Sequence, residues 1–395
     1  MDNIFSDRIT DVPQSFIREI LKVAIDPSVI SFAGGLPNRE LFPFEAIKQA
    51  TETVFRERGR DVLQYSNSEG LKELREYISC RYKKLQKLDI PVENILITNG
   101  SQQGLDLMGK VLINRKDEVV IEEPGYLGAI QAFSLYKPHF NPIGVDMEGM
   151  DIEKFRIVIK EKDPKLIYTV PNFQNPAGIS YSESNRESIA DIIGGTRTLI
   201  IQDDPYGDLR FKGEPKISFK HLIPDNTILL GSFSKTIVPS FRIGWIVAPP
   251  SLMEKLIIAK QASDLHTNLF TQEVIYRFLK ENDLDEHIKT IVRVYGSQKQ
   301  AMTQSIERYF PSEVTATDPE GGMFLWATLP ENLSAMELFN RGIKQKVAFV
   351  PGHPFYINRR DTNTLRLNFS CVDGATIEIG IKRLGNAIKE MIKGI

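Results

Sequence analysis

One lysine and one arginine stand close together in a stretch that is otherwise apolar or rich in hydroxyl groups. Residues 231–245 read Gly-Ser-Phe-Ser-Lys-Thr-Ile-Val-Pro-Ser-Phe-Arg-Ile-Gly-Trp, which puts Lys235 seven positions before Arg242. A partly desolvated lysine has a lowered pKa and can form a Schiff base with a carbonyl compound. A guanidinium, together with the Ser232 hydroxyl, can bind a phosphate. Taken alone, the lysine could equally be a loop lysine and the arginine half of a structural salt bridge.

Further polar groups follow apolar runs elsewhere in the chain. Asp203 and Asp204 end such a run, and a carboxylate there is costly unless it meets a cation or a ligand. Small residues over 99–104 put backbone N–H groups and the Ser101 hydroxyl at a helix start, which suits a phosphate or an ordinary helix cap. A Schiff-base lysine, a carboxylate for a pyridinium nitrogen, phosphate-binding groups and an aromatic ring are together the parts that hold pyridoxal phosphate.

The elements that must position these groups follow an α/β pattern. Short β-branched runs alternate with helical patterns, which is typical of a largely parallel sheet between helices. All but the last run lead into a polar cluster, and open α/β sheets bind ligands at the carboxyl ends of their strands. We therefore expect the polar clusters to meet at one edge of the sheet. The runs cover residues 95–98, 119–121, 166–170, 198–202, 227–230 and 243–248.

The later part of the chain has a different pattern. Apolar residues at helical spacing over 288–310 predict a long amphipathic helix, and alternating segments at 323–327 and 365–369 predict antiparallel strands of a smaller domain. The N-terminal stretch to about Pro43 has no core of its own, so we expect it to pack across both domains. The expected domains are a large one over residues 45–290 and a small one formed by residues 1–44 and 291–395.

Composition argues against several classes of protein. The 49 Lys and Arg residues nearly balance the 51 Asp and Glu residues, so charge favours neither nucleic acid nor an anionic membrane as partner. The chain opens without a signal-peptide pattern and has no apolar run of the roughly 20 residues that span a bilayer, so we expect a cytoplasmic protein. The five histidines are isolated and lack metal-ligand spacing, so we expect no metal site.

The order of these motifs resembles the class I/II aminotransferases, which are fold type I pyridoxal-phosphate enzymes, over nearly the whole chain. The resemblance implies a large α/β domain with a mixed, mostly parallel seven-stranded sheet between helices, and a smaller α+β domain. Four segments look like the 2-aminoadipate and kynurenine aminotransferase branch. They are Ile-Ser-Phe-Ala-Gly-Gly-Leu-Pro-Asn from residue 30, Leu-Gln-Tyr-Ser from residue 63, Thr-Asn-Gly-Ser-Gln-Gln from residue 98 and Val-Ala-Phe-Val-Pro-Gly from residue 347.

The resemblance also implies roles for individual residues. Lys235 would be the Schiff-base lysine and general base, and Asp203 would hold the protonated pyridine nitrogen of pyridoxal 5'-phosphate. The family is dimeric in its active form, and Tyr65 would reach the phosphate from a second subunit. The other cofactor contacts would come from Ser101, Gln102, Tyr126, Asn175, Tyr206, Ser232, Ser234 and Arg242.

The substrate contacts are likewise implied by the resemblance. Arg366 would grip the α-carboxylate, assisted by Asn175, Tyr65 and the backbone near Gly35. Arg18 would meet the distal carboxylate of an acidic substrate, although its segment could equally be the surface face of a helix.

One position departs from the family pattern. The Pro-Gly that often precedes the phosphate arginine reads Pro-Ser at residues 239–240. Serine does not tolerate every positive φ value, so we expect the loop to differ locally at Ser240.

The implied reaction is transfer of an amino group from an L-amino acid to 2-oxoglutarate by a ping-pong mechanism. The donor would be of the 2-aminoadipate, aromatic or branched-chain type.

A pyridoxal-phosphate lyase or decarboxylase on the same fold is the nearer alternative, because cofactor residues do not fix which Cα bond breaks. The pairing of Arg366 with Tyr65 favours transamination. A ligand-sensing regulator of the MocR type would need an added N-terminal DNA-binding region, for which the positions of Gly34 and Tyr65 leave no room.

Overall fold

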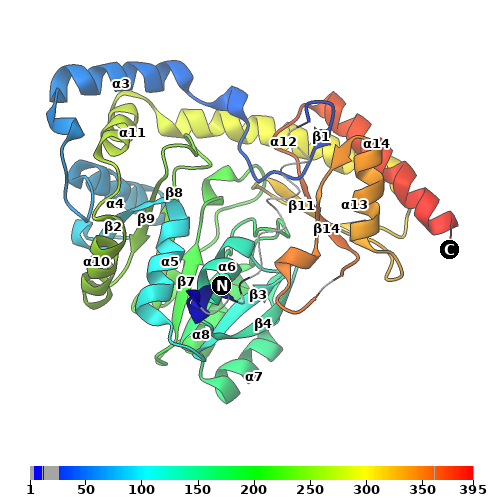
Figure 1. Cartoon of the computed structure of the whole chain (residues 1–395), viewed down its shortest axis with the longest axis horizontal. Helices are drawn as coiled ribbons and strands as arrows, with labels where there is room; N and C mark the ends of the chain where they lie inside the picture. The colour runs from blue at the N-terminus through cyan, green and yellow to red at the C-terminus, as the bar shows by residue number, and fades with distance from the viewer. Residues whose placement is uncertain (1–3, 11, 13–25, 360, 395) are drawn as a thin grey trace.

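Two β-sheets, a large one and a small one, lie beside each other and are bridged by one long helix (Figure 1). The computed structural model describes residues 4–10, 12, 26–359 and 361–394 of the chain. Within these residues, no helix combines the length and the apolar composition needed to cross a bilayer.

The large sheet has eight strands in the order β2, β9, β8, β7, β6, β3, β4 and β5. Neighbouring strands from β8 to β4 run parallel, whereas β9 is antiparallel to both of its neighbours and β5 is antiparallel to β4. The expected seven-stranded sheet corresponds to β2 through β4 in this order, and the two-residue strand β5 adds an eighth at the edge. The strands are β2 (Ile95–Asn99), β3 (Glu118–Glu123), β4 (His139–Asp146), β5 (Gly149–Met150), β6 (Leu166–Thr169), β7 (Leu199–Asp203), β8 (Thr227–Ser232) and β9 (Ile243–Val247).

Both faces of this sheet are covered by helices. In β2, Leu96 packs in the same core as Leu105 of α5, whereas Ile95 and Ile97 pack in a second core with residues of α3, α4 and α11. Successive side chains of a strand point to opposite faces, so these helices lie on opposite sides of the sheet. The helices that belong to the large sheet are α3 (Phe44–Arg58), α4 (Lys72–Gln86), α5 (Gly100–Leu112), α6 (Leu127–Ser134), α7 (Ile152–Lys162), α8 (Glu183–Ile193), α9 (Phe219–Leu222), α10 (Pro250–Asp264) and α11 (Leu269–Glu281).

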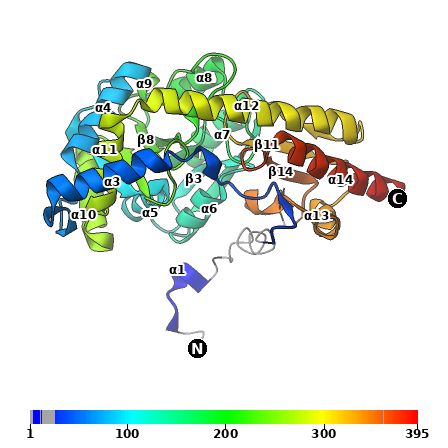
Figure 2. The same cartoon turned by 90° about the horizontal axis from the view of Figure 1, so that it is seen from above.

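The predicted long amphipathic helix is confirmed as α12 (Leu284–Tyr309). Asp283 caps it, since its side chain accepts hydrogen bonds from the backbone N–H groups of Asp285 and Glu286. Figure 2 shows α12 extending from the large sheet to the small one, where α14 (Gly374–Lys393) packs along it.

The small sheet has four strands in the order β10, β11, β14 and β13, and all of its pairings are antiparallel. Its two central strands are the pair predicted from the alternating segments. The strands are β10 (Thr315–Ala316), β11 (Phe324–Thr328), β13 (Val350–Pro351) and β14 (Thr364–Asn368), and α13 (Ala335–Lys344) packs with them and with α14. The domain boundary at residue 290 would fall inside α12 and stays a prediction.

The described part of the N-terminal stretch contacts both halves of the molecule. β1 (Ile30–Ser31) pairs with β12 (Val347–Ala348) in the small domain. Just beyond it, the Ala33 carbonyl accepts from Arg366 and the Gly35 carbonyl accepts from Lys235. The expectation that this stretch spans both domains is therefore confirmed for the part that the structure describes. The remaining elements are α1 (Asp7–Thr10) and the 3₁₀ turns η2 (Arg39–Leu41), η3 (Asp61–Leu63), η4 (Val92–Asn94), η5 (Gly207–Leu209) and η6 (His353–Phe355).

Candidate active site

The polar clusters that follow the strands meet in one cavity of about 360 Å³. β7 and β8 end at Asp203 and Ser232, and α5 begins where β2 ends, so these groups converge at one edge of the large sheet. Arg366 reaches the same cavity from β14 of the small sheet. The lining residues are Gly35, Ser101, Gln102, Tyr126, Val170, Asn175, Asp203, Pro205, Tyr206, Ser232, Ser234, Lys235, Arg242 and Arg366.

Lys235 extends into this cavity from the loop after β8. Its Nζ donates to the Gly35 carbonyl at 2.7 Å. Burial, followed by the positive charges of Arg366 and Arg242, lowers the pKa of Lys235 to about 8. The neutral, nucleophilic amine is thus a minor form at pH 7, but a far larger one than for an ordinary lysine.

Asp203, the last residue of β7, also lines this cavity. It is 2 % exposed, and its Oδ2 accepts from the Tyr168 hydroxyl at 2.8 Å. Its Oδ1 is buried and has no hydrogen-bond partner among the described residues. Burial, with Asp204 and Glu122 nearby, raises the pKa of Asp203 to about 7. A bare carboxylate oxygen in this setting calls for a cationic donor from a ligand.

Hydroxyl groups and a guanidinium gather at one end of the cavity. Ser232 Oγ bonds Ser234 Oγ at 2.9 Å, and Arg242 Nη1 approaches Ser234 Oγ at 3.5 Å. Arg242 otherwise donates only to the carbonyls of Pro239 and Asn99. Because no carboxylate of the described residues pairs with this arginine, its charge remains available to an anion.

The start of α5 forms the wall beside Arg242. A Cβ added to Gly100 would lie 2.4 Å from Arg242 Nη2, so glycine is what lets the guanidinium approach the helix start. Ser101 is in the first turn of α5 and is not its cap, because the capping position is Asn99. Its hydroxyl is therefore not used to cap the helix. Ser101 lines the cavity, and its Oγ makes one long hydrogen bond, to the Gly231 carbonyl at 3.5 Å.

The sequence led us to expect an unusual backbone conformation at Ser240, but Ser240 does not have a positive φ. The residue with positive φ is Arg242 itself, at +56°. This conformation costs a non-glycine residue about 1 kcal/mol and is tolerated where function or packing imposes it. In this loop the left-handed backbone therefore lies at Arg242, whose side chain lines the cavity, and a difference from the loops of the family stays a prediction.

Arg366 stands at the other end of the cavity and is 3 % exposed. Its Nη1 donates to Asn175 Oδ1 at 2.8 Å and its Nη2 to the Ala33 carbonyl at 2.7 Å, while the guanidinium lies over the Phe324 ring at 4.3 Å. Burial lowers the pKa of Arg366 to about 10. All of these partners are neutral, and Arg366 Nε has no hydrogen-bond partner among the described residues. Like Arg242, Arg366 therefore has no carboxylate of the described residues to balance its charge.

One predicted site residue of the described chain, Tyr65, does not line the cavity. Tyr65 is 77 % exposed and lies in a separate hollow with Leu63, His266 and Phe270. Arg18 lies outside the described residues. Conversely, Val170 and Pro205 line the cavity without having been predicted, because apolar residues at strand ends carry no chemical signal of their own.

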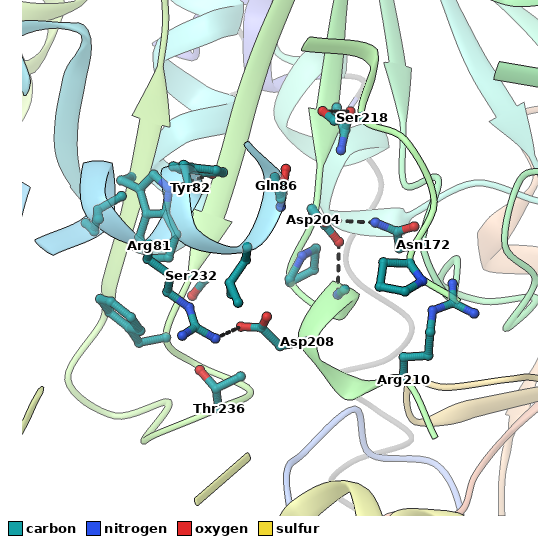
Figure 3. A pocket seen from close by; sticks show the side chains of 18 of the residues that line it. Arg81, Tyr82, Gln86, Asn172, Asp204, Asp208, Arg210, Ser218, Ser232 and Thr236 are labelled. Atoms are coloured by element: carbon teal, nitrogen blue, oxygen red, sulfur yellow. Dashed lines mark hydrogen bonds and ion pairs between the residues drawn. The ribbon is translucent and has the colours of Figure 1, made fainter. Parts of the chain in front are cut away.

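A second cavity of about 300 Å³ is lined in part by Ser232 and Thr236, which stand on either side of Lys235 in the sequence (Figure 3). Its charged groups other than Lys216 are paired with the protein itself. Arg81 donates to Asp208 and Asp285, and Asp204 accepts from Asn172 and from the Gly207 backbone. The first cavity, with its uncompensated charges, is therefore the candidate active site.

The model of the family "aminotransferase class I and II" matches residues 28–384 of this chain. The chain belongs to this aminotransferase family. The aminotransferase is 42 % identical to aromatic-amino-acid aminotransferase 1 of Thermococcus litoralis, over 99 % of this chain and 95 % of that protein.

Solved structures agree with this assignment. The aminotransferase superposes on the kynurenine aminotransferase of Pyrococcus horikoshii, in complex with PMP, with a TM-score of 0.94 at 41 % identity, covering 99 % of this chain and 98 % of the other. It superposes on the α-aminoadipate aminotransferase of Thermus thermophilus, in complex with N-(5'-phosphopyridoxyl)-L-leucine, with a TM-score of 0.93 at 38 % identity, covering 100 % and 99 %. The fold is therefore that of the fold type I pyridoxal-phosphate enzymes.

The aminotransferase depends on pyridoxal phosphate, and the cavity fits that cofactor. The bare Oδ1 of Asp203 suits a protonated ring nitrogen, and the hydroxyl groups with Arg242 suit a phosphate. The amine of Lys235 lies in the same cavity.

Proposed function

We propose that the chain moves an amino group from an L-amino acid of the 2-aminoadipate, aromatic or branched-chain type to 2-oxoglutarate. The observation that carries this proposal is the placement of the Lys235 amine in one cavity with Asp203 and with two uncompensated guanidinium groups. The names of the similar proteins support the donor classes, since they include an aromatic-amino-acid aminotransferase and a 2-aminoadipate transaminase.

The residues that would hold the cofactor fall into four groups. Asp203 would hold the ring nitrogen through Oδ1, and Asn175 with Tyr206 would contact the ring oxygen. Tyr126 would lie against the ring face. The phosphate would be held by Ser101, Gln102, Ser232, Ser234 and Arg242. Bound pyridoxal phosphate supplies an aldehyde for the substrate amine and a ring that withdraws electrons from Cα.

Lys235 would perform the proton transfers. Its lowered pKa leaves part of the amine unprotonated, so Nζ can take the proton from substrate Cα. The same nitrogen would then hold that proton and could give it up again within the cavity. Its present acceptor, the Gly35 carbonyl, belongs to the N-terminal stretch and does not compete for the amine's lone pair.

Arg366 would bind the α-carboxylate of the substrate. Two of its nitrogens are held by Asn175 and Ala33, which fixes the plane of the guanidinium before substrate arrives. A preset charge-assisted contact of this kind orients Cα–H and restricts the substrate's rotation. Gly35, with no side chain, leaves room beside it.

We also propose that the enzyme acts as a homodimer with shared active sites. Tyr65 and Leu63 are 77 % and 70 % exposed, which is unusual for large apolar side chains that cluster together. A second copy seated on this surface would bury them and would bring Tyr65 to the phosphate of the partner subunit.

Half-reaction spectra test the proposed reaction. Purified enzyme with bound cofactor is mixed with 2-aminoadipate, phenylalanine or leucine and followed in the visible range. We expect loss of the aldehyde-form absorption with at least one donor and its return when 2-oxoglutarate is added. Lys235→Ala, which retains the proposed phosphate residues, should show neither change. A spectral change that 2-oxo acids do not reverse, or release of CO₂, would instead indicate a lyase or decarboxylase.

A further inference from the structure

The carboxylate of Asp203 is held on one side only. Tyr168 donates to Oδ2 at 2.8 Å, and Oδ1 has no partner among the described residues. A single contact therefore decides which oxygen is bonded to the protein and which is left for a ligand.

No other neighbour of Asp203 in the described part of the chain provides a comparable contact. The titratable groups that act on it are Tyr168 of β6, Asp204 just after β7 and Glu122 of β3, and it in turn acts on Tyr126 and Tyr206 of the cavity wall. Asp204 and Glu122 are carboxyl groups, and both favour the protonated form of Asp203, as burial does. Within the described residues, the Tyr168 hydroxyl is the group that opposes them by bonding the ionised form.

Tyr168 is itself firmly placed. It is fully buried, and its ring meets Phe133 edge to face at 5.9 Å. The next residue, Thr169, points to the other face of β6 and donates to Glu122 Oε1 at 2.7 Å. Since β6 lies between β3 and β7, its backbone is paired on both sides.

We propose that Tyr168 is a positioning residue, which fixes the Asp203 carboxylate so that Oδ1 remains available to the ring nitrogen of the cofactor. This inference rests on the role proposed above for Asp203 and extends it to a residue that does not line the cavity. Tyr168 would act entirely through Asp203. Its hydroxyl would keep the carboxylate ionised and correctly rotated.

The test compares three substitutions that each remove a single polar feature. Tyr168→Phe deletes the hydroxyl and retains the ring against Phe133. Asp203→Asn removes the charge itself. The matched control is Tyr136→Phe, because Tyr136 donates at 2.9 Å to another carboxylate, Asp106, which does not line the cavity and is not one of the groups named above as acting on Asp203.

Two readouts separate positioning from general stability. The first is the dissociation constant of pyridoxal phosphate, measured by fluorescence titration of cofactor-free protein between pH 6 and 9. The second is the nitrogen-15 chemical shift of ring-labelled cofactor bound to each variant, which reports protonation of the ring nitrogen. Melting temperatures of the cofactor-free proteins record any loss of stability.

We expect Tyr168→Phe to weaken cofactor binding roughly tenfold or more, as loss of a hydrogen bond to a charged group does, and to move the nitrogen shift toward that of Asp203→Asn. Tyr136→Phe should leave both readouts at the parental values even if its melting temperature falls. Parental values for Tyr168→Phe beside a clear effect of Asp203→Asn would overturn the inference but leave the role of Asp203 intact. Parental values for Asp203→Asn would overturn both.

A second variant covers the case in which Tyr168→Phe does not fold. Tyr168→His retains a ring that can donate to the carboxylate. The inference expects its cofactor affinity to lie between those of the parent and Asp203→Asn, and affinity equal to that of Asp203→Asn would contradict it.

Discussion

Lys235, Arg242 and Arg366 all face one cavity, and every described hydrogen-bond partner of these three cations is neutral. Lys235 bonds a backbone carbonyl, Arg242 a hydroxyl and carbonyls, and Arg366 an amide and a carbonyl. Desolvated cations without counter-ions are unfavourable for folding and favourable for binding anions. The residues of the cavity are thus arranged for a ligand that carries both a phosphate and a carboxylate.

Arg366→Lys should reduce kcat/KM for amino acids by roughly ten- to a hundredfold, because lysine retains the charge but cannot offer two parallel N–H donors. The comparison is made with amines that have the same side chain and no carboxylate. Their rates, although low, should change little. Equal losses for amino acids and amines would show that the substitution damages the cavity in general.

Asp203→Asn should stabilise the cofactor-free protein at pH 8. Burial raises the pKa of Asp203 from 3.8 to about 7, so the folded state holds a proton that the unfolded chain releases between those values. The carboxyl group therefore contributes stability below about pH 4 that is lost as the pH rises through 7. Asparagine does not ionise, and the gain over the parent should grow to at most about 4 kcal/mol.

Urea unfolding at pH 4.5 and pH 8 measures this difference. Asp89→Asn is the control, since its side chain is 87 % exposed, and its stability relative to the parent should change little with pH. A gain for Asp203→Asn that is the same at both pH values would contradict the prediction.

At the scale of elements, the helix start at Gly100 and the loop that ends at Arg242 are built around each other. Gly100 has a φ of +72° and Arg242 a φ of +56°, so both segments use left-handed backbone where they meet. The side chain of Arg242 occupies the space that a Cβ of residue 100 would need. The end of the cavity that carries Arg242 is consequently formed by these two turns together.

Gly100→Ala should displace Arg242 and weaken cofactor binding by at least tenfold, besides costing about 1 kcal/mol for the left-handed conformation. Gly195→Ala separates the two effects. Gly195 also has a positive φ, at +77°, but nothing lies within 4 Å of its added Cβ. Both variants should lose similar stability in urea, and only Gly100→Ala should lose cofactor affinity.

The sequence predicted most of the cavity because its residues follow strands whose ends meet at one edge. Lys235, Asp203 and Ser232 were identifiable in this way. Tyr168 was not, since a tyrosine inside an apolar strand has the same pattern as a core residue. β4 was missed for a related reason: Pro142 interrupts it and much of it is only partly buried, so it lacks the β-branched run that marks the inner strands.

At the scale of the whole molecule, Tyr65 is the residue that the single chain leaves unexplained. Its ring meets His266 edge to face at 5.8 Å, and the His266 ring accepts from the Ser66 backbone, so the segment is ordered although Tyr65 is exposed. An ordered, exposed aromatic residue beside Leu63 fits a surface that a second copy covers.

A mixing experiment tests this assignment. Tyr65→Ala and Lys235→Ala should each be nearly inactive as homodimers. If they are unfolded together and refolded, half of the dimers should be mixed, and each mixed dimer should contain one complete site. Activity should then return to about a quarter of the parental value. No recovery, with dimers present in sedimentation, would mean that Tyr65 serves its own chain.

The bond from Arg366 to the Ala33 carbonyl joins residues 333 positions apart. During translation the N-terminal partner leaves the ribosome long before the arginine does. At about 5–20 residues per second, the interval is roughly 15–70 seconds. Late in this interval the nascent chain already contains Lys235 and the strands of the large sheet, yet it still lacks Arg366, the residue proposed to bind the substrate carboxylate. The proposed amino acid site can therefore close only after nearly the whole chain has been made.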